Sequence, residues 1–284
     1  SPMQFNHAII AIKLPAGVES LAAVESAKLG RLLIFDPTDP YTPVGDLPED
    51  EQGSWALIVA AQDGDLVRLP TLPAASNRIQ LAIEGTLAQS GEAKAHVASE
   101  YFGQSASFWR AVSHETGKDE MKKALEAVFT RRLGSGVALD HISASDESSK
   151  LDLALDLQVA HLGQSMMDKL LVVKPGALAP DHGYNFPKIE RKQPIRLRAR
   201  MRTDKVTLHL PEGYAIDELP AEVTINGAYG AYHAVWKAAG GVVTLEQSLE
   251  VKNTTAPAAE YAKVRDFFDT VTGAQYAPVV LAKR

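Results

Sequence analysis

His7 and Asp36 are the two residues whose types and setting could carry acid–base chemistry. His7 opens one apolar run, residues 7–14 (HAIIAIKL), and Asp36 directly follows another, residues 29–35 (LGRLLIF). An Asp that accepts a hydrogen bond from one imidazole nitrogen fixes the tautomer of the ring, so that the other nitrogen can take a proton from a nucleophile. Spacing alone leaves a second interpretation open, in which Asp36 caps the turn before Pro37 and His7 is a polar strand-end residue.

Two buried strands must position this pair. Both runs are short and nearly continuous in apolar residues, and each ends at a proline-containing turn, at Pro15 and at Pro37. If the strands pair antiparallel, the start of the first lies beside the end of the second. The side chains of His7 and Asp36 should then lie about 2.6 to 3.2 Å apart.

The chain contains no cysteine. Thiol nucleophiles, disulfides and thiolate metal sites are therefore excluded within these residues. The seven other histidines show no metal-ligand spacing, and we expect neither a metal nor a cofactor. These histidines are His96, His114, His141, His161, His182, His209 and His233.

Composition describes a globular chain with no electrostatic attraction to nucleic acid. The 284 residues are 45% hydrophobic and 23% charged, and the formal net charge is −6. Nucleic acids and anionic membranes attract clustered Lys and Arg, so neither is an expected partner. Four arginines at period-two spacing, from Arg196 to Arg202, are expected on a solvated strand face. No apolar run is long enough to span a membrane as a helix.

The pattern along the chain predicts an α+β fold that is mostly β, in three domains. Residues 1–73 hold the two apolar strands and a hairpin. Residues 74–176 begin with a hairpin of strands 78–87 and 93–102, continue with two helices at 103–112 and 118–133, and return to strands. Residues 177–284 contain short strands typical of a small sandwich, an amphipathic helix at 256–271 and a terminal strand near 278–281.

The opening of the chain resembles the second half of the transglutaminase-like core, a papain-like fold, in large bacterial proteins that flank this core with domains of unknown function. The resemblance rests on residues 5–12 (FNHAIIAI) and 35–48 (FDPTDPYTPVGDLP), and more weakly on 210–214 (LPEGY) and 260–268 (EYAKVRDFF). It implies that His7 is the base, that Asp36 orients it, and that a Cys on an upstream helix is the nucleophile. Ile9 stands where many relatives have Trp.

The leading hypothesis is therefore a fragment of a transglutaminase-like cysteine enzyme that acts on a peptide or protein amide by acyl transfer or hydrolysis. The fragment would be inactive alone, and its partner would be the N-terminal part of the same polypeptide, which carries the Cys. Without that part, apolar surface around Ile9, Ile10, Leu33 and Ile34 should be exposed or covered by self-association. The alternative is a non-catalytic β-sandwich binding or structural module of a cell-envelope protein. The resemblance implies a periplasmic or cell-surface location.

Overall fold

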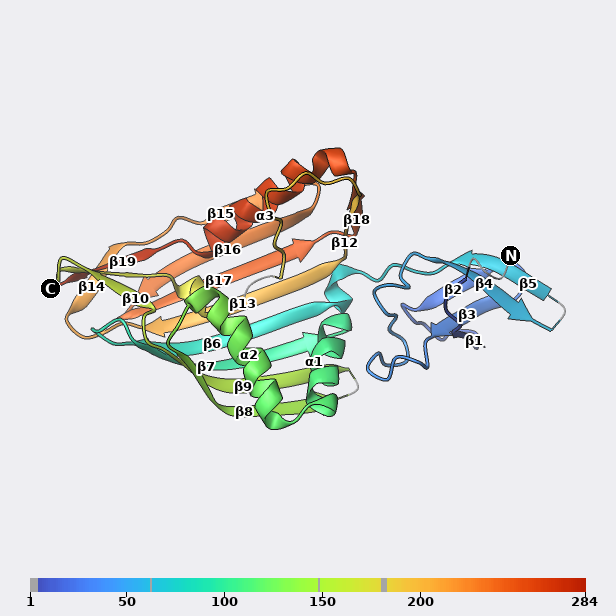
Figure 1. Ribbon diagram of the computed structural model, residues 1–284, viewed down its shortest axis with the longest axis horizontal. Helices are drawn as coiled ribbons and strands as arrows, with labels where there is room; N and C mark the ends of the chain where they lie inside the picture. Colours follow the sequence, from blue (N-terminus) through green and yellow to red (C-terminus); the bar gives the residue numbers. More distant parts are fainter. Residues whose placement is uncertain (1–4, 62, 148, 180–182) are drawn as a thin grey trace.

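The computed structural model describes residues 5–61, 63–147, 149–179 and 183–284. Strands outnumber helices throughout this part of the chain, which confirms an α+β fold that is mostly β. Figure 1 shows a small N-terminal unit, residues 5–73, beside a larger body built on one long sheet. His182 lies outside the described residues.

The N-terminal unit contains a three-stranded sheet and a hairpin. The sheet has the order β1-β3-β2, with β1 at Ile10–Lys13, β2 at Ala23–Ser26 and β3 at Gly30–Phe35, and the hairpin joins β4 (Trp55–Ala60) to β5 (Asp63–Arg68). β1 and β3 pair antiparallel with Ile10 opposite Phe35. The prediction of two buried strands is right for β3 and wrong for β1, whose residues are all exposed because it lies at the edge of the sheet. Ile34, Leu47 and Ile58 are buried between the sheet and the hairpin in a hydrophobic cluster separate from that of the body.

An eight-stranded sheet forms the body, in the order β15-β16-β17-β13-β6-β7-β9-β8. Its strands are β6 (Arg78–Leu87), β7 (Ala93–Phe102), β8 (Val137–Glu147), β9 (Lys150–Val159), β13 (Arg200–His209), β15 (Val223–Asn226), β16 (Gly230–Ala239) and β17 (Val242–Val251). The hairpin predicted at 78–87 and 93–102 is present with those bounds.

The two stretches predicted as separate domains, 74–176 and 177–284, share this sheet. β13 pairs with β6 in parallel, with Val206 opposite Ile83, and all eight strands contribute to or pack against one hydrophobic cluster. The small sandwich expected after residue 177 therefore does not form. Parallel pairing of strands far apart in sequence leaves no local turn or spacing signal, which is why the sequence could not show it.

Three α-helices of the described chain cover one face of the sheet, and the other face is open (Figure 1). They are α1 (Gln104–Glu115), α2 (Lys118–Leu133) and α3 (Tyr261–Gln275). Phe129 of α2 and Phe268 of α3 are buried in the same cluster as Leu155 of β9 and Leu245 of β17. Alternation along each strand sends the intervening polar residues to the opposite face.

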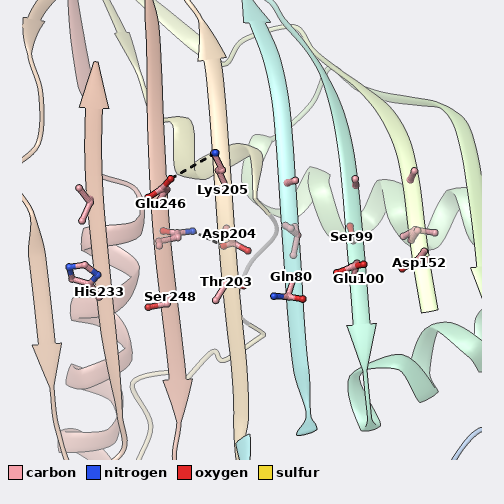
Figure 2. Close-up of a pocket in the computed structure, with 17 residues that line it drawn as sticks. Gln80, Ser99, Glu100, Asp152, Thr203, Asp204, Lys205, His233, Glu246 and Ser248 are labelled. Atoms are coloured by element: carbon pink, nitrogen blue, oxygen red, sulfur yellow. Dashed lines mark hydrogen bonds and ion pairs between the residues drawn. The ribbon is translucent and has the colours of Figure 1, made fainter. Parts of the chain in front are cut away.

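Polar side chains line a groove of about 700 Å³ on that open face. Figure 2 shows Glu100, Asp152 and Glu246 around it, together with Lys205 and His233. Small residues, Ala82, Ala98 and Ala154, lie in register on β6, β7 and β9 and leave space for the groove between the larger polar side chains.

Smaller elements complete the body. A four-stranded sheet has the order β10-β11-β19-β14, and two further strands pair as β12-β18. Their bounds are β10 (Gly163–Met166), β11 (Leu170–Val173), β12 (Ile195–Leu197), β14 (Tyr214–Glu218), β18 (Thr254–Ala256) and β19 (Val279–Lys283), with short 3-10 helices at Ala74–Ser76, Pro175–Leu178 and Ala258–Glu260. β19 confirms the terminal strand expected near 278–281. No helix in the described residues is long and apolar enough to cross a membrane.

Residues 41–54 form a loop of the N-terminal unit that contacts the body. Arg198 forms ion pairs with Glu49 and Asp50, and the Gln104 amide donates a hydrogen bond to Thr42 Oγ1. The predicted solvated arginine face is therefore wrong in part. Arg198 forms ion pairs with the loop 41–54, and Arg202 is buried in the sheet, where it forms an ion pair with Asp204.

Candidate functional site

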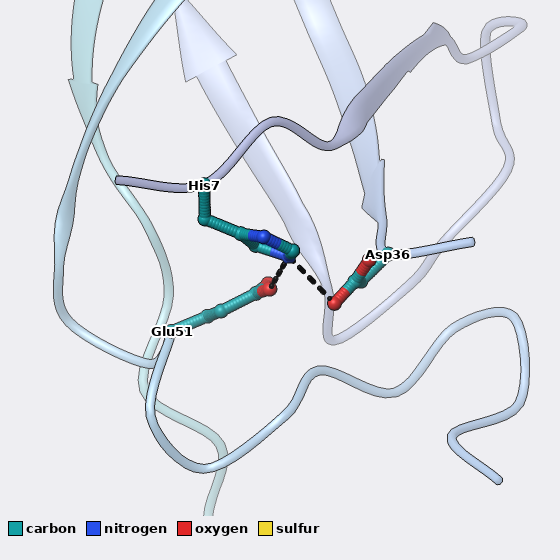
Figure 3. Close-up of side chains that lie close together, drawn as sticks. All are labelled: His7, Asp36 and Glu51. Carbon is teal, nitrogen blue, oxygen red and sulfur yellow. Dashed lines mark hydrogen bonds and ion pairs between the residues drawn. The ribbon is translucent and has the colours of Figure 1, made fainter. Parts of the chain in front are cut away.

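His7 and Asp36 lie in contact, from the ends of two adjacent strands. His7 precedes β1 and Asp36 follows β3, so the antiparallel register brings both to the same edge of the sheet. The distance from His7 Nε2 to Asp36 Oδ2 is 2.9 Å (Figure 3), within the range expected for the pair. The contact is present; the catalytic role of the two residues remains a prediction.

Asp36 is held rigidly in an Asp-Pro-Thr turn. Its Oδ1 accepts hydrogen bonds from the Thr38 backbone N–H at 2.9 Å and from Thr38 Oγ1 at 2.8 Å, which leaves Oδ2 for His7. Burial favours the protonated carboxyl, but hydrogen bonds from His7 and Thr38 outweigh it and hold the pKa of Asp36 at about 2. Asp36 is therefore an anion at neutral pH.

An ionised Asp36 can only accept a hydrogen bond, so Nε2 of His7 carries the proton of that contact. In the neutral ring Nδ1 is then the basic nitrogen. The hydrogen bond to Asp36 raises the pKa of His7 above its ordinary value, which makes the ring a stronger base. His7 is half-exposed, at 44%, whereas Asp36 is only 6% exposed. This arrangement suits a general base with an orienting carboxylate behind it.

Glu51 is a third member of the cluster, and no sequence pattern predicts it. Its Oε1 lies 3.3 Å from His7 Nε2, and its side chain is only 13% exposed. Burial, reinforced by the neighbouring Asp36, raises the pKa of Glu51 to about 7. Glu51 belongs to an irregular acidic stretch of the loop 41–54, where neither spacing nor periodicity distinguishes it from Glu49 or Asp50.

His7, Asp36 and Glu51 could together hold a metal ion. One ligand atom from each lies within 4.8 Å of the others. Imidazole nitrogen with carboxylate oxygens is a donor set found in catalytic zinc sites. The absence of metal-ligand spacing had led us to expect no metal. That expectation considered histidines and regular motifs, and these three donors come from three separate segments of the chain.

Apolar surface lies next to the site, though on fewer residues than expected. Ile10 is 46% exposed and Ile12 is 44% exposed, both on β1, which is an edge strand of its sheet. Leu33 and Ile34 are buried instead, because they lie on the central strand β3 and pack in the cluster of the N-terminal unit. Near the site this exposed apolar surface lies on β1, and the β4–β5 hairpin exposes further apolar residues, Trp55 and Val59 among them.

A family model for DUF3858, described as a domain of unknown function with a solved structure, matches residues 168–281, which is less than half of the chain. One solved structure is similar over 41% of this chain, with 14% sequence identity and a TM-score of 0.34. It is a protein from Parabacteroides distasonis ATCC 8503 described as a putative protease, and the match covers 24% of its length. No curated protein matches the sequence. The DUF3858 match leaves residues 5–54, which hold the site, outside it.

Proposed function

We propose that this chain supplies the base and the orienting acid of a transglutaminase-like cysteine enzyme. The observation that carries the proposal is the 2.9 Å contact between His7 Nε2 and an Asp36 whose second oxygen is fixed by Thr38. The nucleophilic Cys comes from the N-terminal part of the same polypeptide. The chain by itself is inactive, because no thiol is present in it.

In this proposal the two nitrogens of His7 have different roles. Nδ1 accepts the proton of the incoming thiol, and Asp36 stabilises the imidazolium that results. The thiolate then attacks the amide carbonyl carbon, and the imidazolium returns its proton to the departing amine as the C–N bond breaks. Water releases the acyl group in hydrolysis, and a second amine releases it in acyl transfer. Peptides, protein glutamine side chains and cell-wall peptides all present such an amide.

The exposed edge of β1 is where the missing part would dock. Ile10 and Ile12 offer apolar contacts, and the free edge of β1 offers unpaired backbone groups. A segment seated there lies beside His7, on the side where the ring is accessible. We place the parent protein in the periplasm or at the cell surface, following the resemblance of the sequence to exported bacterial proteins.

The test uses a polypeptide extended upstream through the Cys-bearing helix. His7→Ala should lower kcat/KM for amide cleavage by about 1,000-fold or more, because triad members act as a unit. Asp36→Asn should also lower it strongly and should slow alkylation of the Cys by iodoacetamide at neutral pH. His233→Ala, in an exposed His–Glu pair of the body, is the matched control and should change neither rate.

Retained activity in His7→Ala, or an upstream region without any Cys, would refute the proposal. A second function is favoured by the polar groove on the open sheet face, which could make the body a binding or structural module of the cell envelope. In that case peptide or glycan binding should be weakened by Ala98→Phe, which fills the groove floor, and left intact by His7→Ala.

A further inference from the structure

We propose that His7, Asp36 and Glu51 form a binding site for a divalent transition metal of the Zn²⁺ class. His7 Nε2 lies 2.9 Å from Asp36 Oδ2 and 3.3 Å from Glu51 Oε1, and one ligand atom of each residue lies within 4.8 Å of the others. Tetrahedral zinc with ligands at about 2.0 to 2.2 Å separates its ligand atoms by roughly 3.3 Å. The donors therefore need little movement to surround one ion.

The donor chemistry selects the metal. An imidazole nitrogen with two carboxylate oxygens suits Zn²⁺ and its neighbours, whereas Ca²⁺ and Mg²⁺ take oxygen ligands and Mg²⁺ keeps most of its water. Two ionised carboxylates balance the two charges of the ion, so the filled site is neutral. Three protein ligands leave the fourth position of a tetrahedral zinc site for water.

Hydrogen bonds within the fold hold the side chain of Asp36 and the backbone of Glu51 in place. Thr38 holds Oδ1 of Asp36 through its backbone N–H and its hydroxyl, which aims Oδ2 at His7, as the hydrogen-bonded partners of metal ligands commonly do. Glu51 sits in a turn in which its N–H donates to Pro48 O and its O accepts from Ser54 N. Within the described chain, Oε2 of Glu51 is buried and has no hydrogen-bond partner. A cation beside this carboxylate compensates for its lost hydration.

This site does not depend on the proposed function, yet the two cannot operate at once. A metal bound to Nε2 forces the neutral ring to carry its proton on Nδ1. Nδ1 then has no lone pair to accept a proton from a thiol. A bound metal therefore holds the base in an inactive state, and its removal restores the contact between His7 and Asp36.

The 284-residue chain can be tested as it is. After EDTA treatment and removal of the chelator, Zn²⁺ is titrated in competition with a chromophoric indicator, and imidazole nitrogen shifts are followed by NMR. One tight site per chain is expected, with the His7 Nε2 resonance moving on saturation. Glu51→Gln and His7→Ala should each weaken binding by about tenfold or more.

His233→Gln is the matched control. Among the described residues His233 forms an ion pair with a single carboxylate, that of Glu222 at 2.8 Å, so zinc affinity should be unchanged. The rival position is Asp156, which contacts both His96 and His141 on the open sheet face. Zinc affinity that falls in His96→Gln and is unaffected in Glu51→Gln would overturn the proposal, as would a His7 resonance that does not respond to zinc. Because the NMR measurement uses the unaltered chain, misfolding of a variant cannot hide the result.

Discussion

Asp36 and Glu51 both contact the imidazole of His7, yet the pKa values of their carboxyl groups lie far apart, at about 2 and about 7. Hydrogen bonds from His7 and Thr38 lower the pKa of Asp36 against the effect of its burial, whereas burial and the neighbouring Asp36 raise the pKa of Glu51. Two neighbouring acids with separated pKa values are a common property of functional sites.

The raised pKa of Glu51 predicts a pH dependence of stability. Between pH 4.5 and about 7 the folded chain binds more protons at Glu51 than the unfolded chain does, so the contribution of Glu51 to stability falls as pH rises through this window and is constant above it. Glu51→Gln should remove that decline. The change in the free energy of unfolding from pH 4.5 to pH 8 should therefore be more favourable in the variant than in the wild type by about 2 kcal/mol.

Urea unfolding at pH 4.5, 6 and 8, with EDTA present, measures this difference. Glu92→Gln, at an exposed carboxylate in the turn between β6 and β7, is the control and should leave the pH profile as it is. The same profile for Glu51→Gln and wild type would show that Glu51 ionises normally in the folded chain.

At the scale of elements, the apolar pattern of the sequence predicted those strands and helices whose structure depends on residues close together in the chain. The strands predicted at 78–87 and 93–102 and the helix predicted at 118–133 agree with the observed β6, β7 and α2. β2 was missed because Ala23–Ser26 is too short to show a period. The position of His7 beside Asp36 was predictable from strand ends, but Glu51 was not, since an irregular loop brings it there.

The exposed edge strand β1 predicts self-association of the isolated chain. Ile10 and Ile12 project from a strand with one unpaired edge, and such edges pair with other chains. Ile12→Lys should shift the population toward monomer in sedimentation velocity at tens of micromolar. Val59→Lys, at a residue of the β4–β5 hairpin that is 82% exposed, should have a smaller effect. The reverse order would place the contact on the hairpin.

At the scale of the whole molecule, one core joins residues on both sides of position 176. Leu208 of β13 is fully buried beside β6 and packs in the cluster that holds the helices. We therefore expect this body to unfold as a unit, while the N-terminal unit keeps a core of its own.

Leu208→Ala should destabilise the chain by about 2 to 5 kcal/mol. Hydrogen exchange should then speed up in β7 and β9 as well as in β16 and β17, and remain nearly unchanged in β4 and β5. Faster exchange confined to residues after 177 would instead indicate two independent bodies.

The parallel pair of β6 and β13 also matters while the chain is being made. β6 leaves the ribosome with β7 available on one side, but its other edge has no partner until residues 200–209 follow. During that interval Leu81 and Ile83 belong to an unfinished sheet with an open strand, a state prone to aggregation. The cell must therefore protect a nascent chain through much of its synthesis, and slow translation between β9 and β13 would lengthen the exposure.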